Sequence, residues 1–354
     1  MLLTIYPKIL STFTPAFFAI LFGFLLAPLL LRLMSRFRMW KRIAREENNP
    51  DAMSTAYERV HDAAAEKRTP RVGGLIILAG LAATTLFLVF MQTIAPHTLA
   101  GSFDFTSRNQ TLIPIAVLIV MGLMGFGSDL LQIFARAKAW THGYPRLLFM
   151  GMMLTFVLFG SYWFYIKLGV DSVLVPTLGI ISLGWLFVPF FVIVAYAVFS
   201  SGVIDGIDGL AGGVMMIIYA AYGIIAFNQG QYDLSAYCFA VTGSILPFLW
   251  FNIPPARVYM GEVGMLALTS SLTFVAFLTD QVLLLPIIAF PLFITALSSF
   301  LQIISKRYFR TKLFLIAPLH HHFEALGWSR ERIVMKYWVC SVFFALAGVV
   351  LSML

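Results

Sequence analysis

The chain has 354 residues, of which 60% are hydrophobic and only 11% are charged, and its mean hydropathy is +0.90. This composition excludes a protein made of soluble domains and predicts an integral membrane protein. The formal net charge of +8 favours anionic lipid head groups and anionic substrates as partners, and it makes nucleic acid the weaker alternative.

Long apolar runs recur along the whole chain. A helix needs about 20 such residues to cross a bilayer, and continuous runs indicate helices rather than the alternating strands of a membrane barrel. We therefore expect an all-α, polytopic integral membrane protein in which residues 1–354 form a single domain. Pro286 and Pro291 predict a kink in the ninth helix. The predicted spans are about ten, at residues 14–34, 72–95, 111–133, 147–166, 183–200, 209–227, 234–251, 263–279, 282–303 and 335–353.

The distribution of Lys and Arg predicts the orientation of the chain. With ten spans both termini share one side, and the connections on the other side hold all but three of the 24 basic residues, the exceptions being Lys8, Arg108 and Lys167. Basic connections face the cytoplasm, so both termini are expected outside. Basic residues around Trp40, among them Arg36 and Arg38, are predicted to lie at the head-group level, with attraction of an anionic lipid substrate as a hypothesis.

Acidic residues gather at one predicted end of the helices. Placing an ionisable group inside a membrane helix is unfavourable in free energy, so an acid at such a position indicates a structural or functional role. Ten of the 16 acids are expected on outside connections or among bases in the first cytoplasmic loop. The other six map to cytoplasmic helix ends or the last cytoplasmic loop, and they are Asp129, Asp205, Asp208, Glu262, Glu324 and Glu331.

Three short stretches place acids where they could serve chemistry or only structure. Asp129 ends an apolar helix in MGFGSDLLQIF, and a helix-end charge without a task is the alternative. Asp205 and Asp208, in DGIDGLAGG, are three residues apart and near one face of a helix start, where N-capping would also explain them. Glu262 follows a proline-containing loop and opens the eighth span, again with capping as the alternative.

Three adjacent histidines, His320, His321 and His322, stand in the sequence APLHHHFEALGW, which we predict to be a loop. Neighbours on a helix point about 100° apart, so a helix would not bring three rings to one metal, whereas a loop allows two rings to converge. The alternative is that they are ordinary surface or core histidines.

The acids and histidines described above share one predicted location, and this suggests that they form a single site. Carboxylates, imidazoles, Asn252 and basic side chains are predicted at one membrane face, as a site for a divalent metal and a phosphorylated substrate requires. Two unit charges about 4 Å apart repel by roughly 1 kcal/mol in water and about 4 kcal/mol at an effective dielectric near 20. Magnesium and basic side chains would offset that repulsion between a phosphate nucleophile and a diphosphate.

These motifs resemble a known family, the phospho-N-acetylmuramoyl-pentapeptide transferases of bacterial cell-wall synthesis. The resemblance runs through TPRVGG (69–74), GFGSD (125–129), DGIDGLAGG (205–213), FLWFNIPPARVYMGEVG (248–264) and the histidine run. It implies ten membrane helices in the bacterial inner membrane, a cytoplasmic active site, Mg²⁺ and often a homodimer. The implied reaction transfers phospho-MurNAc-pentapeptide from UDP-MurNAc-pentapeptide to undecaprenyl phosphate, giving lipid I and UMP.

The resemblance also implies roles for individual residues. Glu262 stands where the family has its magnesium-binding Asp, and Asp129 matches the second member of a paired-aspartate motif, which makes both of them expected metal and catalytic residues. The three histidines are expected to donate hydrogen bonds to phosphate oxygens. The expected substrate-binding residues are Asp205, Asp208 and Asn252, together with Tyr259 stacking on uracil and Lys67 and Arg68 as substitutes for displaced basic residues.

Several positions depart from the family pattern. Ser128 replaces the first aspartate of the pair, Glu262 is one methylene longer than Asp, and Gly202 stands where Asn is usual. A phosphate monoester is already mostly dianionic at pH 7, so we expect the reaction to need little general-base assistance. The alternatives are a related N-acetylhexosamine-phosphate transferase, a catalytically silent nucleotide-sugar or lipid-binding homologue, and a transporter, which would need polar groups near the bilayer midplane.

Overall fold

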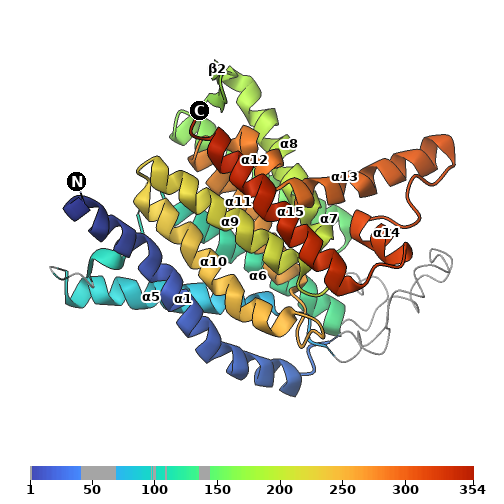
Figure 1. Ribbon diagram of the computed structural model, residues 1–354, viewed down its shortest axis with the longest axis horizontal. Helices are drawn as coiled ribbons and strands as arrows, with labels where there is room; N and C mark the ends of the chain where they lie inside the picture. The colour runs from blue at the N-terminus through green and yellow to red at the C-terminus, as the bar shows by residue number, and fades with distance from the viewer. Residues whose placement is uncertain (1, 41–68, 97, 99–100, 108–109, 135–143) are drawn as a thin grey trace.

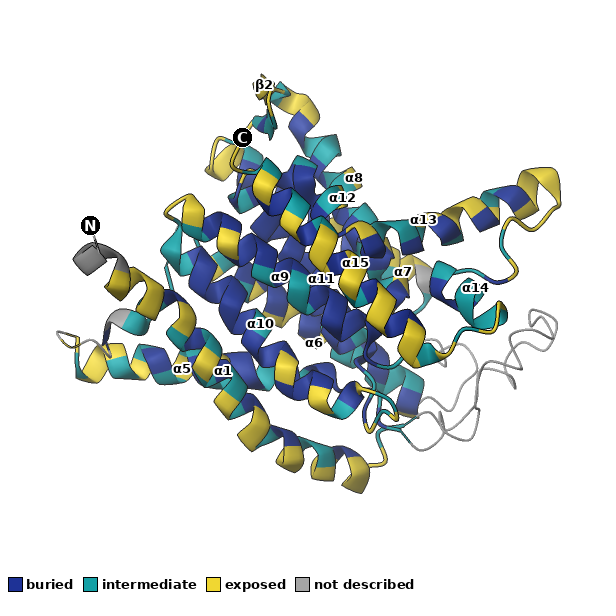
Figure 2. Cartoon of the chain, in the orientation of Figure 1, coloured by how far each residue is buried: buried dark blue, intermediate teal, exposed yellow. Residues whose placement is uncertain are grey.

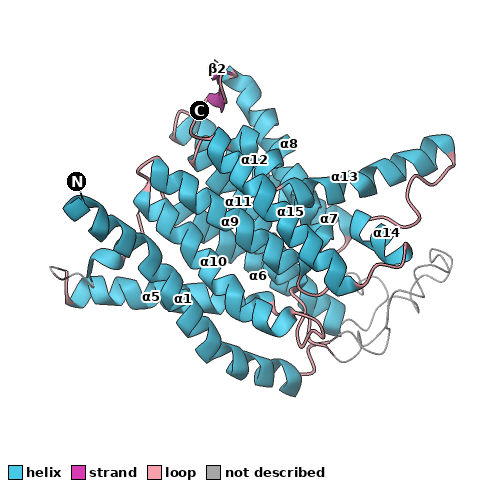
Figure 3. Ribbon diagram, viewed as in Figure 1, coloured by secondary structure: helices cyan, strands magenta, loops and turns pink. Residues whose placement is uncertain are grey.

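The computed structural model describes residues 2–40, 69–96, 98, 101–107, 110–134 and 144–354 of the chain (Figure 1). It is almost entirely helical (Figure 3). The long helices are α1 (Leu2–Arg36), α5 (Gly74–Ile94), α6 (Leu112–Phe134), α7 (Arg146–Tyr162), α8 (Phe187–Ser200), α9 (Leu210–Asn228), α10 (Tyr232–Asn252), α11 (Gly261–Leu278), α13 (Phe290–Ile304) and α15 (Arg330–Leu351). The short ones are α12 (Leu285–Ile288) and α14 (Leu319–Ala325), with single turns η2 (Gly101–Phe103), η4 (Trp163–Lys167), η5 (Gly184–Leu186), η6 (Ser201–Ile204), η7 (Val282–Leu284) and η8 (Ser305–Phe309).

The membrane-spanning character that the composition predicts is confirmed. Within the described ranges, nine helices are long and apolar enough to cross a membrane, and a bent pair of helices would make a tenth. That pair is Val282–Ile288 and Phe290–Phe309, bent by 84°. Pro286 and Pro291 lie in the first turns of α12 and α13, and a proline cannot continue a preceding helix. The ninth predicted span, 282–303, is therefore broken sharply rather than gently kinked.

The helices differ strongly in how far they are buried (Figure 2). In the most apolar window of α11, 89% of the residues are buried, and the corresponding value is 72% for α9 and α10 but only 22% for α1. A helix buried on all sides reads as apolar all round, which is why α9, α10 and α11 form the centre of the bundle. The exposed apolar faces of the outer helices are suited to lipid rather than water.

A small β-hairpin interrupts the helical pattern between α7 and α8. Strands β1 (Ser172–Val175) and β2 (Gly179–Ser182) pair antiparallel, with Val173 opposite Ile181. The tight connection has Thr177 and Gly179 at positive φ. Figure 3 shows the hairpin at the end of the bundle that also holds the C-terminus. The hairpin was not predicted from the sequence, because all four residues of β2 are exposed and show no alternation of buried and exposed positions.

Both ends of the described chain lie at the same end of the bundle (Figure 1). The candidate residues gather at the opposite end, through a series of backbone contacts. Arg71 N–H donates to Met39 O just after α1, Tyr259 N–H donates to Pro70 O, and Glu262 N–H donates to the Asp129 carboxylate. Three connections far apart in sequence therefore meet where α1 ends and α11 begins.

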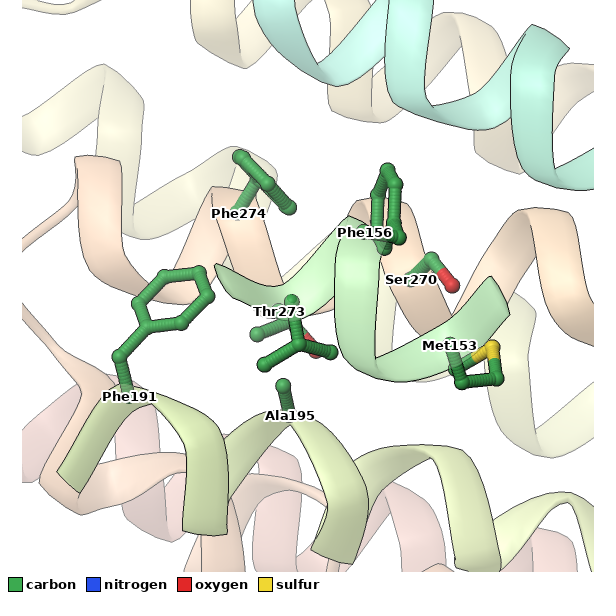
Figure 4. Close-up of a pocket in the computed structure, with 8 residues that line it drawn as sticks. Met153, Phe156, Phe191, Ala195, Ser270, Thr273 and Phe274 are labelled. Carbon is green, nitrogen blue, oxygen red and sulfur yellow. The ribbon is translucent and has the colours of Figure 1, made fainter. Parts of the chain in front are cut away.

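A small apolar pocket lies between α7, α8 and α11 (Figure 4). Figure 4 shows Phe191 and Ala195 projecting from α8 toward this space. The pocket's nearest residue on α11, Ser270, comes eight positions after Glu262, about 12 Å along the helix. It therefore belongs to the membrane interior and not to the polar end of the bundle. Its lining is Met153, Phe156, Val157, Phe191, Ala195, Ser270, Thr273 and Phe274.

Candidate active site

Asp129 joins the end of α6 to the beginning of α11. Its side chain is buried, at 1% exposure, and its two carboxylate oxygens accept hydrogen bonds from the backbone N–H groups of Glu262 (3.2 Å) and Val263 (3.0 Å). The first N–H groups of a helix have no partner inside the helix, and its positive end favours a negative charge. Asp129 thus caps a helix other than its own, which places Glu262 firmly beside it.

Two glycines permit this close approach. A Cβ at Gly125 would collide with the backbone of Glu262, so α6 can pack on the start of α11 only with glycine there. Gly261 has φ +73°, a left-handed conformation that favours glycine, and a Cβ there would meet the backbone oxygen of Arg71 and the Asp129 carboxylate. These positions fix the backbone immediately before the half-buried Glu262.

The TPRVGG segment runs alongside the residues that precede α11. Tyr259 N–H donates to Pro70 O (2.8 Å), Gly73 N–H donates to Tyr259 O (2.8 Å), and Gly74 N–H donates to Met260 O (2.9 Å). This ladder places Arg71 near Asp129 and Asp205, and its positive charge acts on both carboxylates. Lys67 and Arg68 were the basic residues predicted here, and Arg71 was not predicted although it lies inside the TPRVGG motif. Lys67 and Arg68 lie outside the described residues.

Asp205 follows the turn η6 and is exposed to solvent. The surrounding protein nevertheless disfavours its ionised form. Desolvation raises the pKa of its carboxyl to about 6, with the negative charges of Glu262 and Asp208 acting in the same direction. The Arg71 charge and the backbone N–H of Gly261 act the other way and lower that pKa. Asp205 therefore keeps a solvent-exposed side chain while its protein surroundings raise the pKa of the carboxyl.

Asp208 links the DGIDG segment to two other loops. Its carboxylate accepts a hydrogen bond from the backbone N–H of Ala256 (3.2 Å). Desolvation raises the pKa of this carboxyl and Glu324 adds to the rise, while the Ala256 N–H and the Arg330 charge lower it. Asp208 is therefore coupled electrostatically to the segment that carries the histidines.

Asn252 is buried and uses both ends of its amide inside the protein. Its Oδ1 accepts from the backbone N–H of Gly209 (3.0 Å), and its Nδ2 donates to Val258 O (2.9 Å). These contacts tie the DGIDG segment to the loop before α11. The family resemblance implies substrate binding by Asn252, and the structure gives its side chain a role in positioning two site loops.

The histidine run is helical, so the predicted loop is wrong. Leu319–Ala325 form α14, in which His320 and His321 are buried and their ring centroids lie 4.2 Å apart. The Nε2 atoms of both rings pack on Gly206, where a Cβ would collide with them. His322 points elsewhere, and its Nδ1 accepts from Leu315 N–H (3.2 Å). The helical spacing thus brings two of the three histidines to the acidic segment and separates the third.

Glu324 and Arg330 hold His321 in place. The Glu324 carboxylate contacts His321 Nδ1 at 2.5 Å and accepts from Arg330 Nε at 2.8 Å. A carboxylate can only accept, so Nδ1 carries the proton and Nε2 faces Gly206. In the sequence, Glu324 is one of the six acids predicted at the cytoplasmic face, and no role was predicted for it. Its i, i+3 spacing from His321 was the available signal once the run is read as a helix.

The structure also locates the departures from the family pattern. Ser128 is buried on α6 beside Asp129. At Gly202, in η6, an added Cβ would approach only Met265, at 3.7 Å, so the protein interior leaves room for a larger side chain. Tyr259 is half-buried and anchored through its backbone in the ladder described above.

The donor chemistry fits a magnesium ion that is shared with a substrate. No group of three or more His, Cys, Asp or Glu side chains in the described part of the chain is already arranged around a metal position. Magnesium is commonly held by one or two carboxylates, with water and substrate phosphates completing its shell. Asp129 and Glu262 lie side by side at the start of α11, and a carboxylate that accepts two backbone hydrogen bonds retains further acceptor positions.

Comparisons with known proteins agree with this geometry. The model of the family described as "Glycosyl transferase family 4" matches residues 111–280. A Geobacillus kaustophilus protein named phospho-N-acetylmuramoyl-pentapeptide-transferase is 35% identical over 285 residues, which are 79% of this chain and 83% of that protein. The protein of the same name from Bacillus subtilis is 31% identical over 340 residues, 94% of this chain and 96% of that protein.

The similarity therefore extends over nearly the whole length of such relatives and includes every segment that meets at the polar end of the bundle. Taken with the nine spanning helices among the described residues, it identifies the kind of enzyme. The chain belongs to the phospho-N-acetylmuramoyl-pentapeptide-transferase family of membrane-embedded transferases.

Proposed function

We propose that this protein transfers phospho-N-acetylmuramoyl-pentapeptide from UDP-MurNAc-pentapeptide to a prenyl phosphate, producing lipid I for peptidoglycan synthesis. Besides the family relationship, one structural observation supports this function. Four carboxylates, from Asp129, Asp205, Asp208 and Glu262, meet Arg71 and two imidazoles at one end of a membrane bundle. Such a mixture suits a nucleotide diphosphate that must react with a lipid phosphate at a membrane surface.

The proposed reaction is a phosphoryl substitution. An oxygen of the prenyl phosphate attacks the sugar-bearing phosphorus of the diphosphate, a new P–O bond forms, and the bond to the uridylate oxygen breaks, so UMP leaves. The protein's task is to bring two anions together and to balance the charge on the oxygens. Arg71 supplies a fixed positive charge at the acidic cluster, and His320 and His321 present nitrogen atoms beside the DGIDG segment.

Magnesium is part of this proposal. Glu262 and Asp129 would hold the ion, and when bound it would offset negative charge on the phosphates. Asp129 in addition holds the start of α11 in place, so Glu262 is presented from a fixed helix end. Glu262 is half-buried rather than fully enclosed, so its extra methylene need not be packed into the core.

The membrane arrangement is also proposed. The polar end of the bundle faces the cytoplasm of a bacterial inner membrane, because the basic connections belong to that end. UDP-MurNAc-pentapeptide would arrive from water and the lipid, undecaprenyl phosphate, from the bilayer. A homodimer is the assembly that the family resemblance suggests.

A specific observation supports one other function, that of a silent homologue which binds the nucleotide sugar without turnover. Ser128 stands beside Asp129 where the family pairs two aspartates, and Gly202 leaves space where a larger polar side chain is usual. We favour the active enzyme because Asp129, Glu262, His320 and His321 are all present and brought to one end of the bundle.

The deciding experiment is UMP release by purified protein in detergent or nanodiscs, with magnesium and undecaprenyl phosphate. The donors compared are UDP-MurNAc-pentapeptide and UDP-GlcNAc, with Glu262→Ala as the inactive control. Release from the muramoyl donor alone supports the proposal. Release from UDP-GlcNAc would indicate a related N-acetylhexosamine-phosphate transferase, and nucleotide binding without any release would indicate the silent homologue.

A further inference from the structure

The end of α13 carries a concentrated positive charge. We define the basic tip as residues 305–315, which begin with the turn η8 and end before the loop into α14. Four of these residues are basic and exposed, and they are Lys306, Arg307, Arg310 and Lys312. No Asp or Glu occurs in the sequence between Asp280 and Glu324, so the tip contains no acid of its own.

Large apolar side chains project from the same tip. Tyr308 and Phe309 are each 72% exposed, and Leu313 is 59% exposed. Exposed large aromatic side chains are unfavourable in water. Next to basic residues they are typical of the membrane interface, where apolar groups enter the acyl boundary and basic groups stay at head-group level. The combination distinguishes this tip from an ordinary cytoplasmic loop.

The tip has a defined shape. Gln302, buried on α13, accepts hydrogen bonds at Oε1 from the N–H groups of Leu313 and Phe314, both at 3.0 Å, and its Nε2 donates to Phe314 O. Ser305 Oγ donates to Thr311 O (2.9 Å). These contacts close the chain on itself, so the basic residues are presented on a folded turn.

The direction of α13 takes the tip away from the other helices. The 84° bend at Ala289 sends α13 out of the bundle, and Figure 1 shows its far end standing apart before the chain returns to α14. Because α14 packs on the polar end of the bundle through its histidines, the tip lies at the edge of the active-site face.

We propose that the basic tip is a docking surface for the head groups of anionic phospholipids of the surrounding membrane. Its charge complements such head groups, and its exposed aromatic residues match the depth at which they lie. This surface is separate from the substrate site and does not depend on the proposed reaction. The phosphate of the lipid substrate offers the same chemistry, and the experiment below separates the two sources.

The test measures which lipids stay bound to the purified full chain after equilibration with an equimolar mixture of phosphatidylglycerol and phosphatidylcholine, using mass spectrometry. The test variant is Arg307→Gln/Arg310→Gln/Lys312→Gln. The matched control is Lys167→Gln/Arg332→Gln/Lys336→Gln, which removes three exposed basic residues on η4 and α15. We expect the wild type and the control to enrich phosphatidylglycerol on the order of fivefold, and the tip variant to lose most of that enrichment.

A conservative variant, Arg307→Lys/Arg310→Lys, keeps the charge and is expected to keep the enrichment, which separates loss of charge from misfolding. Equal enrichment in the wild type and the tip variant would overturn the proposal. So would displacement of phosphatidylglycerol by a small amount of undecaprenyl phosphate but not by inorganic phosphate, because the tip would then serve the substrate. A tip variant that loses only self-association, with unchanged lipid binding, would instead indicate a second copy of the chain as occupant.

Discussion

The acidic end and the histidine end of the site are built in different ways. Asp129 and Glu262 are positioned by backbone hydrogen bonds between α6 and α11, and α11 is the most buried helix that the structure describes. His320 and His321 stand on a seven-residue helix whose link to the site passes through side chains, chiefly Glu324. The two carboxylates are thus held rigidly by backbone hydrogen bonds, while the placement of the histidines depends on a few side-chain contacts.

The largest effect is expected from Asp129→Ala, which removes the carboxylate that caps α11. The change leaves two N–H groups of α11 without their acceptor, so Glu262 shifts and UMP release falls by about 100-fold or more. Loss of the cap also lowers the free energy of unfolding by roughly 1–2 kcal/mol, measured by thermal unfolding in detergent. Asp171→Ala, an exposed acid far along the chain, is the matched control. Wild-type activity in Asp129→Ala would contradict this role.

A smaller loss is expected at the histidine end from Glu324→Gln. An amide in place of the carboxylate holds His321 less strongly, so kcat falls about tenfold while the KM for the nucleotide changes little. Glu324→Asp should recover part of the loss. Glu331→Gln removes an exposed acid on the next helix and should leave kcat unchanged. If Glu324→Gln and Glu331→Gln have equal activity, the contact to His321 does not position a functional ring.

At the acidic end of the site, ligand binding is expected to depend on pH through the ionisation of Asp205. Asp205 has a folded pKa of about 6, above its ordinary value of 3.8, so its ionised form is disfavoured in the free protein. Its contribution to stability is therefore unfavourable at neutral pH and is relieved as the pH falls through about 6. Magnesium or substrate binding that needs the carboxylate should weaken over the same range, about twofold at pH 6. Asp205→Asn should bind weakly at every pH, and an unchanged pH profile in that variant would remove Asp205 from the binding process.

The smallest effect is expected outside both ends of the site. Arg36→Gln/Arg38→Gln removes two exposed charges after α1 that we predict to attract the lipid phosphate. The apparent KM for undecaprenyl phosphate should rise by about twofold or less, because exposed charges are screened by salt. The KM for the nucleotide should stay constant. Equal changes in both KM values would show that these residues do not act on the lipid.

The sequence predicted the parts of the fold that follow from composition. Apolar length gave the spanning helices, since a bilayer demands long continuous runs, and the predicted ends agree closely for helices such as α6 and α9. The 84° break was underestimated, because proline identifies a weak point in a helix but not the angle that neighbouring packing imposes. The exposed hairpin β1–β2 carried no periodic pattern and was not predicted.

The site was predicted as a set of residues but not as an arrangement. Asp129, Asp205, Asp208 and Glu262 do meet, as their shared position at helix ends suggested. The cap that Asp129 provides to α11, the bridging amide of Asn252 and the contact between Glu324 and His321 all join residues or segments by tertiary structure. Arg71 was overlooked because only the ladder with Tyr259 reveals its direction toward the acids.

The most direct test of the central claim is a magnesium titration of UMP release by the wild type, Glu262→Asp and Glu262→Gln. If Glu262 holds the ion at the capped start of α11, Glu262→Asp will retain magnesium-dependent turnover, and Glu262→Gln will lose most of its rate and need more magnesium for what remains. A Glu262→Gln protein with the rate and magnesium dependence of the wild type would contradict the account, because the ion would then be held without this carboxylate.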